Sequence, residues 1–79
     1  MYIGITVDMS KYNGAVFDLR ISDFLTIRKV VEISWQIQKM EMAPPEGYWV
    51  KIDNKDKVCS GYESLMDSGI TNGDKIKIL

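Results

Sequence analysis

The chain has 79 residues, of which 46% are hydrophobic and 27% charged, so we expect a single globular domain over residues 1–79. Ten basic residues against eleven acidic ones give a formal net charge of -1, which provides no field to attract nucleic acid or an anionic membrane. No apolar run approaches the roughly 20 residues of a spanning helix, and the first residues do not resemble a signal peptide, which predicts a cytoplasmic protein without direct membrane insertion.

The sequence contains little that could perform chemistry. There is no histidine, the usual general base and metal ligand. Cys59 is the only cysteine, falls at the end of a short predicted strand, and is interpreted as structural. The aspartates lack the spacing of a calcium loop and are interpreted as turn formers: Asp53, Asp56, Asp67 and Asp74. We therefore predict no catalytic residue, metal or cofactor, and a protein that is not an enzyme.

An amino-terminal hairpin is the first predicted unit. Apolar residues alternate with Gly4, Thr6 and Asp8 from Ile3 to Met9, which is typical of a strand with one buried face. Asn13 and Gly14 then favour a tight turn, because both tolerate positive φ. Apolar alternation resumes from Val16 to Ile21, predicting a second, antiparallel strand.

The spacing then becomes helical. Ser22 and Asp23, or Thr26, could cap the first turn. The expected apolar stripe has three- and four-residue intervals and consists of Ile27, Val30, Val31, Ser34, Ile37 and Gln38, widened by Ile33 and Met40. Trp35 lies off this stripe; it could be presented to a partner, but a core position near Pro44 and Pro45 is favoured. These prolines require the helix to end before them.

The second half of the chain reads as three short strands. Tyr48, Val50 and Ile52 alternate with Trp49 and Lys51, a polar turn follows over residues 53–56, and residues 57–59 return. The segment 61–69 is a predicted loop with room for one helical turn around residues 64–66. After a reversal at residues 71–74, residues 75–79 alternate Lys and Ile as the final strand.

The predicted order is therefore ββαβββ. A helix covering one face of a mixed five-stranded sheet buries every apolar stripe, and the helical crossover obeys the right-handed rule. Inserting the last strand beside the first gives an α+β fold of the β-grasp type. A ferredoxin-like fold would need a second full helix, which the glycines between residues 59 and 74 disfavour.

Four segments carry a resemblance to a known family. They are residues 8–20 (DMSKYNGAVFDLR), 30–38 (VVEISWQIQ), 47–58 (GYWVKIDNKDKV) and the Ile-Thr-Asn-Gly-Asp sequence of residues 70–74. Together they resemble the YukD/EsaB family of small bacterial ubiquitin-like proteins. The resemblance implies a ubiquitin-like domain that serves as an accessory component of the type VII (ESX/Ess-like) secretion machinery of Gram-positive bacteria, whose components would be its partners.

Two other functions stay open at this point. A ubiquitin-like covalent modifier or sulfur carrier is the alternative, but such proteins need a flexible tail ending in Gly-Gly, and here Lys77, Ile78 and Leu79 fall inside the predicted last strand. A structural adaptor could instead dimerise through an exposed sheet edge, since we expect the second and middle strands to leave backbone groups unpaired. The oligomeric state is left open.

The candidate protein-binding residues come from the sheet face opposite the helix. Strand alternation places on this face five residues that form a mixed apolar and basic surface: Thr6, Trp49, Lys51, Lys75 and Lys77. The competing interpretation is that Trp49 only covers the sheet and packs on the lysine stems. If this face is not the binding surface, the helix side around Arg28, Lys29 and Glu32 is the next candidate.

Overall fold

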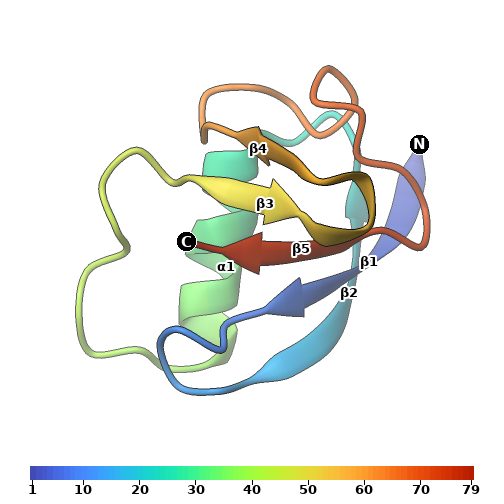
Figure 1. The fold of residues 1–79 in the computed structure, drawn as a ribbon. Helices are drawn as coiled ribbons and strands as arrows, with labels where there is room; N and C mark the ends of the chain where they lie inside the picture. Colours follow the sequence, from blue (N-terminus) through green and yellow to red (C-terminus); the bar gives the residue numbers. More distant parts are fainter.

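The computed structural model describes residues 1–79 as a five-stranded sheet with one α-helix packed on one side (Figure 1). A 3-10 turn, η1 (Asp53–Lys55), connects the third and fourth strands. The other elements are β1 (Tyr2–Asp8), β2 (Val16–Ser22), α1 (Ile27–Ile37), β3 (Val50–Ile52), β4 (Lys57–Cys59) and β5 (Lys75–Ile78). None of the helices has the length and apolar character needed to cross a membrane.

The strand order across the sheet is β2-β1-β5-β3-β4. β5 runs parallel to β1 and antiparallel to β3, while β1 with β2 and β3 with β4 form antiparallel hairpins. The predicted order and the β-grasp arrangement are confirmed. The edges are β2, as expected, and β4; the prediction that the middle strand leaves its backbone unpaired is wrong, because β3 has a partner on each side.

The helix α1 begins after Thr26, whose side chain accepts a hydrogen bond from the Lys29 backbone N–H at 3.2 Å. This settles the choice of cap left open by the sequence. Ser22 instead accepts the backbone N–H of Phe24, in the preceding turn. Thr26 also forms an isolated antiparallel bridge with Ser64. This bridge connects the start of the helix to the long loop before β5.

The end of the helix corrects the predicted stripe. The buried residues of α1 are Ile27, Val30, Val31, Ser34 and Trp35, whereas Ile37 is 48% exposed. The helix ends at Ile37, one turn earlier than a stripe reaching Met40 requires, so Trp35 is its last buried residue, and Met40 packs against the core from the loop that follows. Its indole Nε1–H donates to the Met42 carbonyl at 3.0 Å, and its ring meets Tyr12 edge-on with centroids 4.9 Å apart. The preference for a core Trp35 is thus confirmed.

The start of β3 is a second correction. Tyr48 was predicted to lie in the strand, but it has φ 50, in the left-handed region, and β3 begins only at Val50. The left-handed backbone turns the Tyr48 ring away from the alternation, and the ring lies 5.0 Å from the Arg28 guanidinium carbon on the helix. Tyr48 is half-buried at the edge of the core instead of sitting within the sheet.

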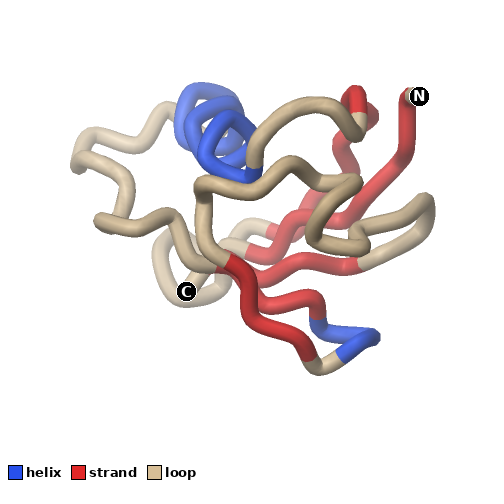
Figure 2. Tube along the Cα trace, turned by 90° about the horizontal axis from the view of Figure 1, so that it is seen from above, coloured by secondary structure: helices blue, strands red, loops and turns tan.

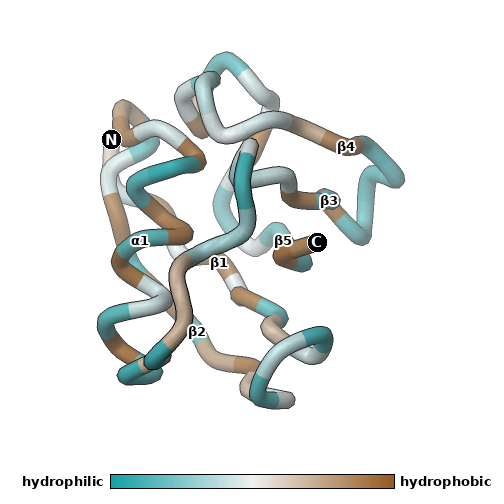
Figure 3. The backbone as a smooth tube through the Cα atoms, turned by 90° about the vertical axis from the view of Figure 1, so that its left-hand side faces the viewer, coloured by the Kyte–Doolittle hydropathy of each residue, from teal (hydrophilic) through white to brown (hydrophobic).

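Sixteen buried hydrophobic residues form one core between the sheet and α1. Apolar and polar segments alternate along α1 and the strands, as expected for elements with one buried side (Figure 3). The loop before β5 contributes Leu65 and Ile70 and contains the predicted turn, with a hydrogen bond from Ser68 N–H to the Ser64 carbonyl but no helix. Cys59 is 3% exposed within this core.

Candidate functional site: the outer face of the sheet

The helix covers only one side of the sheet (Figure 2), and we call the other side the outer face. The register assigns its residues, since side chains directly opposite each other on paired strands point to the same side. From the β2 edge to the β4 edge, the residues are Val16, Asp18, Arg20 and Ser22; Tyr2, Gly4, Thr6 and Asp8; Lys75 and Lys77; Lys51; and Val58. The burial patterns of β1, β3 and β5 agree with this assignment, except that Asp8 is buried although it lies on the outer face.

One row of side chains crosses all five strands of the outer face. The register places its members in the order Val16, Asp8, Lys77, Lys51, Val58, and we call this set the cross-strand row. The row has two lysines directly opposite each other at its centre and an exposed valine at each end. The centre of the outer face is therefore basic, with apolar side chains toward the two edges.

The lysines of the outer face differ in how they are compensated. Lys51 Nζ lies 3.1 Å from Asp56 Oδ1, and Lys75 Nζ lies 3.8 Å from Asp8 Oδ2. Lys77 makes no ion pair within 4 Å. The Ser10 backbone N–H, which donates to Asp8 at 2.8 Å, lowers the pKa of Asp8, and the nearby Lys75 and Lys77 charges lower it further. Asp8 is therefore ionised at neutral pH and offsets only part of the basic charge.

Trp49 extends the outer face beyond the start of β3. Its carbonyl accepts the backbone N–H of Leu79 at 3.0 Å, so the pairing of β3 with β5 continues for one more residue. Trp49 is 49% exposed, and its indole lies against Gly47. A Cβ at residue 47, where φ is +83°, would be 2.6 Å from the indole Nε1. The absence of a side chain at Gly47 therefore leaves the space that the indole occupies.

The remaining predicted residue, Thr6, sits opposite Lys75 and donates its hydroxyl to Asp18 Oδ1 at 2.8 Å. All five predicted residues therefore lie on the outer face, with Thr6 paired to Lys75 and Lys51 paired to Lys77. Sequence reasoning missed the other members of the cross-strand row. The two-residue alternation of β4 signals Val58, but Asp8 was recognised only as a spacer within the first strand.

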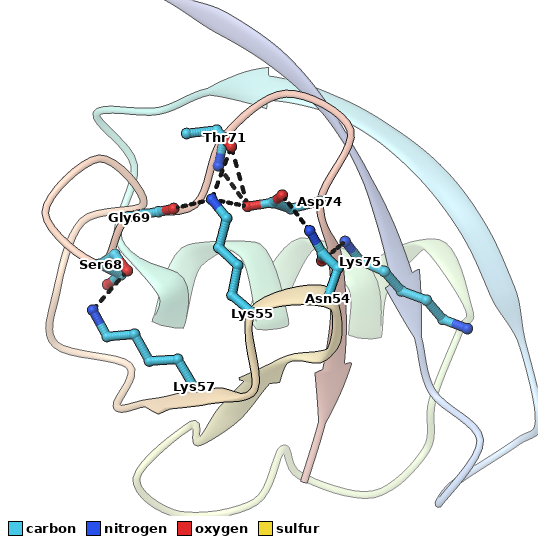
Figure 4. A network of polar contacts seen from close by, with 8 residues as sticks. All are labelled: Asn54, Lys55, Lys57, Ser68, Gly69, Thr71, Asp74 and Lys75. Carbon is cyan, nitrogen blue, oxygen red and sulfur yellow. Dashed lines mark hydrogen bonds and ion pairs between the residues drawn. The ribbon is translucent and has the colours of Figure 1, made fainter.

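A polar network fixes the segment that leads into β5 (Figure 4). The carboxylate of the buried Asp74 accepts hydrogen bonds from Lys55 Nζ at 2.8 Å, Asn54 Nδ2 at 2.7 Å and the Thr71 backbone N–H at 2.8 Å. The Asn54 amide oxygen in turn accepts the backbone N–H of Lys75 at 3.0 Å. This network joins η1 to the start of β5 and so determines where Lys75 enters the sheet.

The electrostatics of the network are those of a structural site. Burial alone would raise the pKa of Asp74, but the hydrogen bonds from Lys55, Thr71 and Asn54 outweigh it, and the pKa is lowered. Every oxygen of the carboxylate is engaged by protein donors. The prediction of Asp74 as a turn former is correct, since it accepts the N–H of a residue three positions earlier, but its role as the centre of a network was not foreseen.

An open hollow of about 410 Å³ lies on the outer face near the β2 edge. It exists because Gly4 carries no side chain between the flanking Asp18, Arg20 and Asn72. The Gly4 backbone N–H donates to Asn72 Oδ1 at 2.8 Å, and the Gly73 N–H donates to the Gly4 carbonyl at 2.7 Å. Both backbone groups of Gly4 are therefore bonded to the turn that precedes β5.

Solved structures define the class of protein. The chain aligns with the ubiquitin of Caldiarchaeum subterraneum at a TM-score of 0.75 and 19% identity, covering 99% of this chain and 91% of that one. It aligns with the UBL domain of Plasmodium falciparum Dsk2 at a TM-score of 0.66 and 20% identity, covering 100% of both chains. At these identities the likeness shows the fold alone, and the fold is that of a ubiquitin-like β-grasp protein.

Sequence comparison then identifies the family. Residues 2–78 match the family described as "WXG100 protein secretion system (Wss), protein YukD". The chain is also 56% identical over 79 residues to the ESX secretion system protein YukD of Bacillus subtilis (strain 168), covering 100% of each chain. The chain belongs to the YukD family, and the resemblance noted from its sequence segments is confirmed.

Proposed function

We propose that the protein is a non-catalytic accessory component of a type VII (ESX) secretion system that acts from the cytoplasm by binding an acidic surface of a secretion component. The outer face is the docking surface. The observation that carries the proposal is the pairing of Lys51 with Lys77 at the centre of the cross-strand row. Like charges directly opposite each other destabilise a sheet, so the fold gains nothing from this arrangement.

The neighbouring groups leave the pair available to a partner. Lys51 is only partly compensated, because its partner Asp56 is itself 88% exposed and such surface pairs contribute little. Lys77 has no ion partner. Trp49 and Val58 flank the pair with exposed apolar area, and tryptophan is among the residues that contribute most at protein interfaces. A partner with carboxylates facing Lys51 and Lys77 and an apolar contact for Trp49 would complement this surface.

The experiment compares two variants with the same change in charge. Lys51→Glu/Lys77→Glu inverts the charge at the centre of the outer face and keeps like charges opposite each other at residues 51 and 77. Because it also places a carboxylate opposite Asp8, the fold of the variant is checked by circular dichroism. Lys29→Glu/Lys39→Glu makes the same change at exposed residues on and just after the helix. Tagged forms are returned to the host, secretion components that co-purify are identified, and export of WXG100 proteins is measured.

We expect the outer-face variant to lose co-purification and export while the control keeps both. Loss only in the Lys29/Lys39 variant would place the docking surface on the helix side and refute the outer face. Retention by both folded variants would refute both surfaces. The same purification tests the modifier alternative, which predicts Leu79 joined covalently to other proteins. In the structure the Leu79 N–H bonds to Trp49 and its carbonyl oxygen accepts the Tyr12 hydroxyl at 2.7 Å.

A further inference from the structure

β2 forms one edge of the sheet, and β1 is the only strand beside it (Figure 1). Two hydrogen bonds establish which of its backbone groups are free: Met9 N–H to the Ala15 carbonyl at 2.8 Å, and Asp23 N–H to the Met1 carbonyl at 2.9 Å. In an antiparallel pair, alternate residues direct both backbone groups toward the same neighbour. The odd-numbered residues of β2 therefore bond to β1, and Val16, Asp18 and Arg20 direct their N–H and C=O groups away from the sheet.

The side chains of this edge carry opposite charges without ion partners. Neither Asp18 nor Arg20 forms an ion pair within 4 Å in the chain, although Asp18 Oδ1 accepts the Thr6 hydroxyl. Edge strands are protected by charges when all of them share one sign, because an approaching copy then brings like charges. On β2 the signs alternate, and no proline interrupts the strand. The core side of the edge adds Phe17 and Leu19, which are only partly buried.

The free groups restrict how a second copy could add to this edge. Only even-numbered residues offer backbone groups, so antiparallel registers differ by steps of two residues. A register centred on Leu19 places Asp18 opposite Arg20 of the other copy, and the reverse by symmetry. Shifting by one step places Asp18 opposite Asp18, or Arg20 opposite Arg20. Charge therefore selects the register centred on Leu19.

We propose that two copies of this chain associate through antiparallel pairing of β2 with β2, centred on Leu19, into one continuous sheet. The interface is isologous and closes on itself as a two-fold dimer. Directly opposed residues point to the same side of a sheet, so both outer faces lie on the same side of the dimer. The two cross-strand rows then form one extended basic surface, and a partner with two acidic sites would bind it with increased avidity.

The test uses sedimentation equilibrium of the purified full chain over concentrations up to about 1 mM, where even weak association is detected. The average molecular mass of the wild type is expected to rise with concentration from the 9.0 kDa of the monomer toward twice that value. Asp18→Arg and Arg20→Asp each place like charges across the interface and are expected to remain monomeric. An equimolar mixture of these two variants restores opposite charges at every pair, so it is expected to dimerise.

Two further variants control the experiment. Lys29→Asp makes the same charge change as Arg20→Asp on the helix and is expected to dimerise like the wild type. Arg20→Pro removes an N–H that makes no bond within the sheet and blocks the edge, so a folded monomer is expected, checked by circular dichroism. A wild type that stays monomeric at every concentration, or a mixture that associates no more than its components, overturns the proposal. Neither result depends on the proposed secretion partner.

Discussion

Replacing Asp74 by alanine tests the network that connects η1 to β5. The change removes the acceptor of the Asn54 amide, which costs about 1 kcal/mol, and leaves the Thr71 backbone N–H without its partner, which costs about 1–3 kcal/mol. Lys55 loses its carboxylate but keeps the Gly69 carbonyl at 2.7 Å and the Thr71 hydroxyl. Because these losses share one carboxylate and are not additive, we expect a total of about 3 kcal/mol.

Urea denaturation followed by tryptophan fluorescence measures the change in the free energy of unfolding. For a domain of this size the expected loss lowers Tm by roughly 12–24 °C. Asp67→Ala is the matched control, since Asp67 is an exposed aspartate of the same loop, and its effect is expected to stay within about 0.5 kcal/mol. A loss below about 1 kcal/mol for Asp74→Ala would show that the network does not hold this segment.

The pH dependence gives an independent check of the same reasoning. The folded pKa of Asp74 lies below its unfolded value of about 3.9, so its contribution to stability is fully present above that pH and is lost as the pH falls through the folded pKa. The stability difference between the wild type and Asp74→Ala should therefore shrink below about pH 4. A stability difference that stays constant from neutral to strongly acidic pH would contradict the lowered pKa of Asp74.

Two further predictions concern the end of β5 and the loop before β3. Gly47→Ala forces a Cβ against the Trp49 indole at a positive φ, so we expect a loss of about 1–3 kcal/mol in the unfolding free energy and a change in the Trp49 emission spectrum; an unchanged spectrum would contradict the contact. Tyr12→Phe removes the hydroxyl that donates to Leu79 and should cost about 1 kcal/mol. Burial raises the pKa of Tyr12, so its stability contribution is present below about pH 10 and is lost as the pH rises through the folded pKa. In absorbance titration, the phenol with the raised pKa should be missing from Tyr12→Phe.

Local pattern carried the prediction of the elements. β1 and β2 show a two-residue alternation, and the chain from Ile27 onward shows three- and four-residue spacing. Both patterns follow from the geometry of one chain segment beside a core, so they can be recognised in the sequence without the rest of the molecule. Alternation was also sufficient to place Thr6, Lys51, Lys75 and Lys77 on one side of the sheet. Whether a partner uses that side is a question for the charge-inversion variants.

Local pattern failed where the backbone departs from its regular period. Tyr48 fits the apolar alternation of a strand in the sequence. Its left-handed φ, directly after Gly47, bends the backbone there, so the strand begins only at Val50. Ile37 fits the helical spacing, yet the helix ends there, and Trp35 is the residue that closes the core because its indole reaches the Met42 carbonyl. In both places the deciding residues lie in the loop between α1 and β3: Gly47 and Tyr48 through their backbone conformation, and Met42 through its carbonyl.

The sequence by itself determined the kinds of element, their order and the side of the sheet on which each candidate residue lies. Only the tertiary structure decided which of those residues are neighbours. The pairing of Asp8 with Lys77, and of Lys77 with Lys51, depends on inserting β5 between β1 and β3, strands that are far from one another along the chain. Register between such distant strands is set by packing the whole core at once, and no period within a single segment records it.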